Sequence, residues 1–204
     1  MIEFFTRRIY RKERAITMEQ TLVKDKNNNQ EDRIERGTVE DINTLAELYD
    51  DLNDYLSTNT NYPGWIKGIY PIRETAEEGV KNGTLFVIRR NNEIAGTIIL
   101  NQDQPDAYNN VRWGVDAKEQ EVIVVHTLAV NPRFMKLGIG KKLMEFAVDY
   151  SREQKVRTLR LDVFYKNSPA IALYEKSGFT YVDTVDLGLN IPDLVWFRLY
   201  EINY

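Results

Sequence analysis

The stretch from residue 121 to residue 140 constrains the fold more than any other part of this chain. Residues 121–130 are rich in β-branched side chains, which predicts a strand, and Pro132 ends it. Gly138 and Gly140 then open a predicted helix with one apolar face, formed by Leu143, Ala147 and Tyr150. A strand joined by a glycine loop to a helix belongs to an α/β-type domain and is the arrangement that binds phosphates.

The glycine loop can bind an anion through its backbone. The first N–H groups of a helix are unpaired and lie at the positive end of its dipole, and glycine lets a pyrophosphate approach without a Cβ clash. Lys136, Lys141 and Lys142 add positive charge nearby. A tight strand-to-helix turn remains the alternative. A dinucleotide-binding fingerprint is not indicated, because Leu143 stands where its third glycine belongs.

A second informative segment, residues 167–179, reads Asn-Ser-Pro-Ala-Ile-Ala-Leu-Tyr-Glu-Lys-Ser-Gly-Phe. Ser168 is a natural helix N-cap, Pro169 a natural first helical residue, and Gly178 ends the helix. Tyr174 shares a helix face with Ala170 and Leu173. By spacing alone, Tyr174 is interpreted as a core aromatic residue.

The rest of the chain supplies further strands and helices around these two segments. Residues 1–33 form a charged extension, and residues 34–204 form one α/β domain. Thr38 with Asp41 predicts a helix start, and Asn91-Asn92 predicts a hairpin turn. Strands are expected at 84–90, 93–101, 121–130, 158–164, 179–186 and 194–201; helices at 42–56, 71–83, after 138–140, and 168–177; and a polar loop at 102–120.

Together, the two informative segments resemble the CoA-binding motifs of the GNAT superfamily of N-acetyltransferases, in the order and at the separation of that family. The resemblance covers about residues 34–204. It implies a mixed, mostly antiparallel central sheet that splays after its fourth strand and is flanked by helices. It also implies that acetyl-CoA binds in the resulting V.

The resemblance assigns roles position by position. The stretch Leu128, Ala129 and Val130 would bind the pantetheine arm and the thioester through its backbone, and Asn167 would contact the cofactor arm. Tyr174 would lie beside the thioester sulfur as general acid. The pyrophosphate would be bound by the loop Met135, Lys136, Leu137, Gly138, Ile139, Gly140 and Lys141.

Met135 departs from the family pattern, which usually has Arg or Gln there. A backbone cradle does not depend on that side chain. The departure nevertheless leaves a second reading open, a catalytically silent acyl-CoA-binding regulatory module.

An acetyltransferase acting on an alkylamine needs a base, because such an amine has a pKa of about 10 and is mostly protonated at neutral pH. His126 is the only histidine of the chain and lies two residues before Leu128. Some family members that acetylate arylalkylamines carry a histidine at that position. A buried core histidine is the alternative reading. Glu121, at the start of the strand, is the second candidate, acting through water.

The acceptor is the least determined part. Tyr62, Trp65 and Tyr70 lie where the family covers its acceptor side, and their aromatic rings would suit a hydrophobic or cationic amine. A small loop core is the competing interpretation. The expected acceptor is therefore a small-molecule amine or a peptide N-terminus, received by direct attack in a ternary complex.

Composition narrows the remaining classes. The chain has no cysteine, which excludes disulfides and thiolate metal ligands, and no metal is expected. A net charge of −4 argues against nucleic acid as a partner, and no apolar run is long enough to cross a membrane. A cytoplasmic enzyme is expected, and a homodimer is left open.

Overall fold

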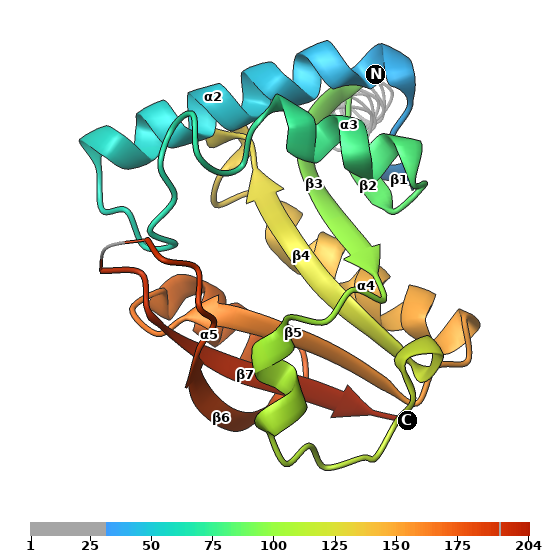
Figure 1. Cartoon of the computed structure of the whole chain (residues 1–204). Coiled ribbons are helices and arrows are strands. Elements are labelled where there is room, and N and C mark those ends of the chain that lie inside the picture. The colour runs from blue at the N-terminus through green and yellow to red at the C-terminus, as the bar shows by residue number, and fades with distance from the viewer. Residues whose placement is uncertain (1–31, 192) are drawn as a thin grey trace, which may run out of the picture. The chain divides into compact units, whose positions relative to one another are not determined.

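The computed structural model describes residues 32–191 and 193–204. Residues 1–31, most of the expected extension, lie outside the described residues, and the boundary at residue 33 stays a prediction. A seven-stranded sheet has the order β1-β2-β3-β4-β5-β7-β6 (Figure 1). Its strands are β1 (Asp32–Arg36), β2 (Leu85–Arg90), β3 (Glu93–Asn101), β4 (Val122–Val130), β5 (Thr158–Phe164), β6 (Thr180–Asp186) and β7 (Trp196–Asn203). The helices are α2 (Ile42–Thr58), α3 (Arg73–Lys81), α4 (Ile139–Glu153) and α5 (Ser168–Lys176).

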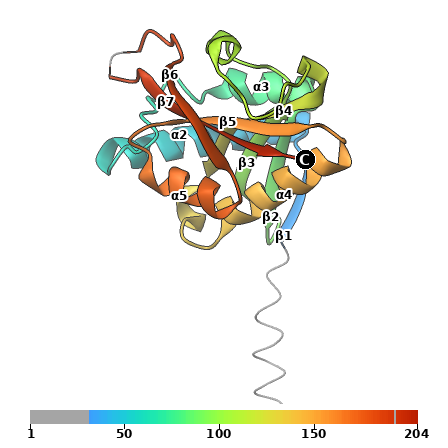
Figure 2. The same cartoon turned by 90° about the horizontal axis from the view of Figure 1, so that it is seen from below.

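The helices cover opposite faces of the sheet. The apolar stripe of α2, including Leu45, Leu48 and Leu52, packs with residues of β2 and β3 on one face. Leu143 and Ala147 of α4 and Ile171 of α5 pack on the other face against β4 and β5. Figure 2 shows α4 and α5 on the side of the sheet opposite to the segment between β3 and β4. Each helix is therefore fixed by burial of the apolar face that its 3.6-residue period creates.

The sheet is splayed between β4 and β5, as the family resemblance implies. β4 pairs with β5 in parallel from Val122–Thr158 only as far as Val125–Leu161. The pairs β2–β3, β3–β4, β5–β7 and β6–β7 are antiparallel. Beyond Val125 the two strands diverge, β4 toward α2 and β5 toward the C-terminal strands (Figure 1). A V-shaped opening therefore lies at the carboxyl ends of β4 and β5, and the predicted mixed, mostly antiparallel sheet is confirmed.

Several local predictions are confirmed where short-range chemistry determines the backbone. Asn91 and Asn92 both have positive φ values, 52° and 66°, and join β2 to β3 in a tight hairpin. The backbone N–H and hydroxyl of Thr38 donate to Asp41 Oδ2 at 3.0 and 3.2 Å, so the capping pair forms as expected. It caps a short 3₁₀ turn (Val39–Asp41) that leads into α2.

Other boundaries differ from the sequence predictions. The N-cap of α5 is Asn167 and not Ser168, because Asn167 Oδ1 accepts from Ala170 N at 3.3 Å. The last strand begins at Trp196 and not at 194, since Leu194 turns into an apolar cluster with Phe164 and Phe197. The strand β1 was not predicted at all. Its sequence Asp-Arg-Ile-Glu-Arg has one apolar residue, as an edge strand allows.

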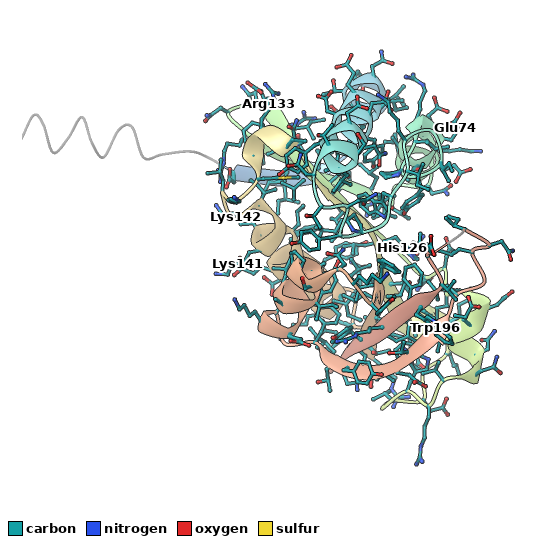
Figure 3. All side chains as sticks on the ribbon, turned by 90° about the vertical axis from the view of Figure 1, so that its left-hand side faces the viewer. Glu74, His126, Arg133, Lys141, Lys142 and Trp196 are labelled. Atoms are coloured by element: carbon teal, nitrogen blue, oxygen red, sulfur yellow. The ribbon has the colours of Figure 1, made fainter. Side chains whose placement is uncertain are left out.

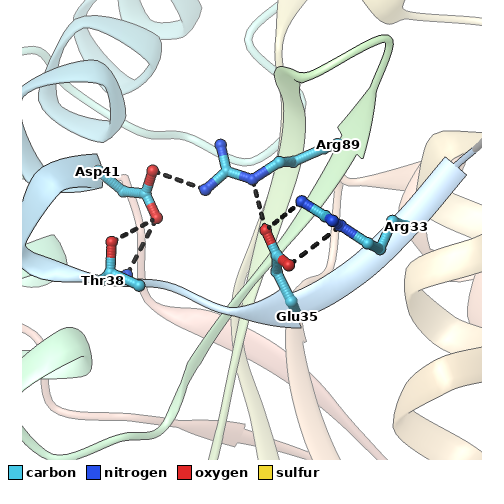
Figure 4. Close-up of polar contacts among 5 residues, drawn as sticks. All are labelled: Arg33, Glu35, Thr38, Asp41 and Arg89. Atoms are coloured by element: carbon cyan, nitrogen blue, oxygen red, sulfur yellow. Dashed lines mark hydrogen bonds and ion pairs between the residues drawn. The ribbon is translucent and has the colours of Figure 1, made fainter.

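Figure 4 shows how β1 and the start of α2 are tied to β2. Arg89 on β2 donates from Nε to Glu35 Oε1 at 2.6 Å and from Nη2 to Asp41 Oδ1 at 2.7 Å. Partial burial raises the pKa of Asp41, but hydrogen bonds from Arg89 and Thr38 outweigh it and lower that pKa overall. This network fixes the entry to α2, whose C-terminal end leads into the aromatic loop beside the V.

Candidate functional site

The floor of the V is an irregularity in β4. The register between β3 and β4 shifts between the pairs Thr97–Ala129 and Ile99–His126, so β4 carries an extra residue there. Thr127 has a φ of 43°, which a β-branched residue adopts only when its surroundings impose it. A bulge of this kind bends its strand locally, and this one lies just beyond the last pairing of β4 with β5.

One side of the V is the glycine loop that opens α4. The backbone N–H groups of residues 136–141 make no hydrogen bond to an acceptor among the described residues. Lys136 and Gly138 have φ values of 61° and 80°, and a Cβ built on Gly138 would meet nothing within 4 Å. Six consecutive backbone donors are therefore without a partner in the described residues, which suits binding of a phosphate group.

The surface around this loop carries charges of both signs. Figure 3 shows Arg133, Lys141 and Lys142 on one side of the molecule, where Arg133 pairs with Glu93 and Lys141 with Glu145. A groove of about 630 Å³ continues from Lys141 between α4 and α5, with Arg152 and Lys176 among its lining residues. Glu145 and Asp149 also line it, so the groove carries both signs of charge.

Met135 and Asn167, two residues of the predicted cofactor set, have their side chains engaged within the protein. The Met135 side chain packs against the apolar cluster under α2, so the structure gives no reason to expect a charge there to reach a phosphate. Asn167 uses its carbonyl oxygen to cap α5. Leu128 and Val130 flank Gly140, each with a methyl group 3.9 Å from the position of a Cβ built on that glycine.

Tyr174 on α5 is buried among core residues, with 8% of its surface exposed. Its hydroxyl has no hydrogen-bond partner in the described residues and is not among the fully buried atoms that lack one, so it keeps some exposed surface. Burial, and secondarily the charge of Asp162, raise the pKa of Tyr174 far above its ordinary value. The phenol therefore keeps its proton at every working pH, which suits a proton donor.

His126 is half-buried and lies between the part of the sheet that carries α2 and the part that carries β7 (Figure 3). Its Nε2 is 3.1 Å from the backbone oxygen of Asp103. A carbonyl oxygen only accepts, so Nε2 carries the hydrogen of the neutral ring. Nδ1 is then the nitrogen that can take up a proton.

Asp162 is a further candidate site residue, which the sequence patterns did not indicate. It follows Leu161, the last β5 residue paired with β4, just as His126 follows Val125 on β4. The two side chains therefore start from neighbouring positions at the point where the strands diverge. Tyr108 donates from its hydroxyl to Asp162 Oδ2 at 2.9 Å. A charged residue inside the otherwise apolar second half of a strand was the signal available in the sequence.

The electrostatics of Asp162 reflect this enclosure. Burial raises its pKa, while the charge of His126 and the hydrogen bond from Tyr108 lower it in part. Burial is the largest cause of the raised pKa values of Tyr70, Tyr108 and Tyr174, and the negative charge of Asp162 raises each of them further. Asp162 is thus linked by electrostatics to His126 and to three tyrosines, and by a hydrogen bond to one of them, Tyr108.

Glu121 is not brought together with these residues. It lies immediately before β4, where β4 and β5 are still paired, five residues before His126 and thus about 16 Å away along the strand. Its Oε2 accepts from Lys118 N at 2.9 Å and lies 4.0 Å from Arg157 Nη1. Glu121 therefore closes a turn at the far end of the strand.

The predicted acceptor aromatics divide between two environments. Trp65 and Tyr70 pack edge to face with centroids 5.7 Å apart, and the Tyr70 hydroxyl hydrogen-bonds to Thr127 at the β4 bulge. Tyr62 is exposed. This loop also touches the one between β6 and β7, because Leu194 Cδ1 lies 2.5 Å from the position of a Cβ on Gly64. Two loops from opposite sides of the V therefore meet beside it.

In residues 32–191 and 193–204, no three His, Cys, Asp or Glu side chains are grouped as a metal site needs. Over the same ranges, no helix is both long and apolar enough to span a bilayer.

Comparison with known proteins gives one consistent result. The model of the acetyltransferase (GNAT) family matches residues 45–179. The uncharacterized N-acetyltransferase YesJ of Bacillus subtilis is 26% identical over 112 residues, covering 55% of this chain and 61% of YesJ. The [ribosomal protein bS18]-alanine N-acetyltransferase of Escherichia coli is 42% identical over 52 residues, covering 26% of this chain and 35% of that enzyme.

A solved structure agrees with this match. The structure of yncA from Salmonella typhimurium with its cofactor acetyl-CoA has a TM-score of 0.62 at 14% identity, covering 84% of this chain and 93% of that one. At that identity the likeness concerns the fold. The chain spans about three fifths of the length of YesJ, and about one third of the bS18-alanine enzyme.

Proposed function

The chain belongs to the GNAT family of acetyltransferases, and we propose that it transfers the acetyl group of acetyl-CoA to a primary amine by direct attack within a ternary complex. One observation carries the proposal. The parallel pairing of β4 with β5 ends at Val125–Leu161, so His126 and Asp162 are the first residues of the diverging strands, and this divergence supports a cofactor site between them.

The residues present fit the cofactor of the family. Acetyl-CoA carries a pyrophosphate, and the unpaired N–H groups of residues 136–141 before and in the first turn of α4 are donors of the kind that bind such a group. Gly138 leaves the approach to them free of side-chain atoms. The backbone of Leu128 and Val130, beyond the last pairing with β5, would bind the extended arm.

When bound, acetyl-CoA supplies a thioester whose carbonyl carbon forms the new C–N bond and whose C–S bond breaks. Tyr174 would give its phenolic proton, or a strong hydrogen bond, to the departing sulfur. His126 would take the first proton of the ammonium at Nδ1, because Nε2 already donates to Asp103. The second proton, lost from nitrogen as the amide forms, would replace the one given to the sulfur. Asp162 would stabilise the imidazolium that forms, in the way a buried carboxylate supports a protonated histidine.

The acceptor is proposed to arrive as a cation. An alkylamine is mostly ammonium at neutral pH, and Asp162 with the surrounding tyrosine rings provides a carboxylate and aromatic faces that attract such a charge. Both a small amine and a peptide N-terminus satisfy this requirement. The bS18-alanine enzyme, matched over 52 residues, is named for an alanine of a ribosomal protein and favours including peptides among the acceptors tested.

The proposal is tested by thioester turnover. The full chain is incubated with acetyl-CoA and a panel of alkylamines, arylalkylamines and short peptides with free N-termini, and release of CoA thiol is followed. We expect turnover with at least one class and an acetyl-CoA-dependent rise in melting temperature that NADH does not produce. Stabilisation by acetyl-CoA without turnover of any acceptor would instead support the silent regulatory module.

Replacement of His126 by Gln tests the proposed base. We expect a loss of kcat/KM that is largest near pH 7 and fades above about pH 9, because an amine with a pKa of about 10 then supplies more of its own neutral form. The measurement is the pH profile of kcat/KM with the best acceptor of the panel.

Glu121→Gln is the matched comparison, since it also removes one titratable group beside β4. Its profile should follow that of the parent because Glu121 lies at the paired end of the strand. A pH-independent loss in His126→Gln, or the expected pattern in Glu121→Gln instead, would reject His126 as the base.

A further inference from the structure

The segment between β3 and β4 is longer than a hairpin needs and is held firmly to the C-terminal half of the sheet. Arg160 of β5 donates from Nη1 to Gln104 Oε1 at 2.8 Å and from Nη2 to Val115 O at 3.1 Å. Its guanidinium carbon lies 4.0 Å from the ring centroid of Trp113. Glu201 of β7 accepts from Gly114 N at 2.7 Å. Residues of two neighbouring strands thus anchor this one segment.

Tyr108 is the centre of that segment. It lies in a short 3₁₀ helix (Asp106–Asn110) and is 3% exposed. Its ring packs against Trp113 with centroids 4.9 Å apart, and its backbone oxygen accepts from Trp113 Nε1 at 3.1 Å. Burial and the charge of Asp162 raise the pKa of Tyr108 well above its ordinary value, so the hydroxyl keeps its proton to donate.

The same segment contacts both His126 and Asp162. The Tyr108 hydroxyl donates to Asp162 at 2.9 Å, and the backbone oxygen of Asp103 accepts from His126 at 3.1 Å. A hydroxyl and a carbonyl, five residues apart in one segment, therefore orient two side chains that belong to different strands.

We propose that Tyr108 is a positioning residue, which holds the Asp162 carboxylate ionised and oriented toward His126 through the hydrogen bond it donates. The proposal rests on the function proposed above in so far as it concerns catalysis. In the same proposal, residues 102–120 form one side of the space that the acceptor enters. Through Tyr108 this segment also sets the pH range in which His126, supported by Asp162, can accept a proton.

The direction of the effect follows from the hydrogen bond. A donor to a carboxylate favours its charged form, so removing the donor raises the pKa of Asp162 further. The groups on other elements that interact electrostatically with Asp162, besides Tyr108, are His126 on β4, Tyr174 on α5 and Tyr70 on the α2–α3 loop. All of them remain in a Tyr108→Phe variant, which also keeps the ring that packs on Trp113.

The primary experiment measures Asp162 directly and needs no substrate. Protein labelled with ¹³C at the aspartate carboxyl carbons is titrated by NMR, with Asp162→Asn used to assign the resonance. In Tyr108→Phe the midpoint of the Asp162 titration should move up by about one pH unit, the size expected for a hydrogen bond to a charged group. With 3,5-difluorotyrosine at position 108, a stronger donor of nearly the same shape, it should move down.

The kinetic arm uses the acceptor found in the turnover assay. The acid limb of kcat/KM should shift upward by the same amount in Tyr108→Phe, giving about a tenfold loss on that limb and recovery at high pH. Binding of CoA should not change, because the segment lies on the face of the sheet opposite α4 and α5 (Figure 2).

Tyr181→Phe is the control, because it removes a hydroxyl from an exposed tyrosine whose partner is Thr184 on the same strand. It should leave both the titration and the profile unchanged. An Asp162 midpoint that is the same in the parent, the Phe variant and the difluorotyrosine protein overturns the proposal. A shifted midpoint without acetyl transfer would keep the Tyr108–Asp162 link and reject the proposed function instead.

Discussion

Leucine in place of Gly138 is expected to lower the affinity for CoA by about tenfold or more. Gly138 has a φ of 80°, and a Cβ there would meet nothing within 4 Å, so a side chain would extend into the space in front of the unpaired N–H groups. A pyrophosphate bound to those groups would compete with it for that space. Calorimetric titration with CoA measures the effect.

Gly138→Leu also places a side chain on a residue with positive φ, which lowers the stability of the protein. This effect must be separated from the steric effect on CoA affinity. Gly68 in the α2–α3 loop is a close match, with a φ of 74° and nothing within 4 Å of the position that a Cβ would take. Gly68→Leu should therefore suffer the same left-handed penalty, of about 1–2 kcal/mol, without lowering CoA affinity. Equal CoA affinities in the parent and Gly138→Leu would place the phosphate site elsewhere.

Features set by short-range chemistry could be predicted from the sequence alone. The paired asparagines at 91–92 take the positive φ values that a tight hairpin needs, and the strand expected at 158–164 has the same bounds in the structure. The loop before α4 was predicted from Gly138 and Gly140, which come shortly after the end of the preceding strand, and Gly138 is the N-cap of α4 in the structure. In each case the residues that determine the backbone are neighbours in the chain.

The site itself depends on contacts between distant segments, and here the sequence was insufficient. Asp162 becomes special only because β4 and β5 stop pairing after Val125–Leu161, and no local pattern locates that point. Tyr108 reaches Asp162 from 54 residues away. Conversely, Glu121 directly precedes the strand that carries His126, yet the direction in which the V opens leaves it at the paired end. The sequence shows that Glu121 lies next to the strand that carries His126, but it does not show at which end of that strand the V opens.

The segment of residues 102–120 illustrates the same limit. Its polar composition predicts a loop, and most of its residues are irregular in the structure. Its anchoring comes from a buried arginine and a buried glutamate on the sheet, Arg160 and Glu201, which are 4% and 6% exposed. Buried charges of this kind need partners, and the loop supplies them through carbonyl, amide and aromatic groups. A segment whose composition predicts a loop can therefore be held in one position by its packing contacts.

Tyr174→Phe is expected to lower turnover by about tenfold at least, and by as much as the 10²–10⁴-fold typical of general-acid help. The change removes only the hydroxyl. The ring would keep its place among Ile171, Phe179 and the other residues of the core around α4, so folding and acetyl-CoA affinity should remain near those of the parent.

The geometry explains why the hydroxyl should matter. The ring is fixed by burial while the hydroxyl keeps some exposed surface and has no partner in the described residues, so none of these residues competes for its proton. Its pKa is raised by burial first and then by Asp162, which keeps the proton in place until a developing thiolate can accept it. A phenol in this state would donate to the leaving sulfur at neutral pH.

The measurement is kcat with saturating acetyl-CoA and the best acceptor, alongside acetyl-CoA affinity and melting temperature for each protein. Tyr150→Phe is the matched control. It removes a hydroxyl from another tyrosine packed on the same core, but on α4 and stacked with Phe146. If Tyr174→Phe turned over at the parent rate, the hydroxyl would have no part in the reaction. A loss confined to Tyr174→Phe, with acetyl-CoA affinity unchanged, would assign it to the departing sulfur, because the remaining interactions with the cofactor are then intact.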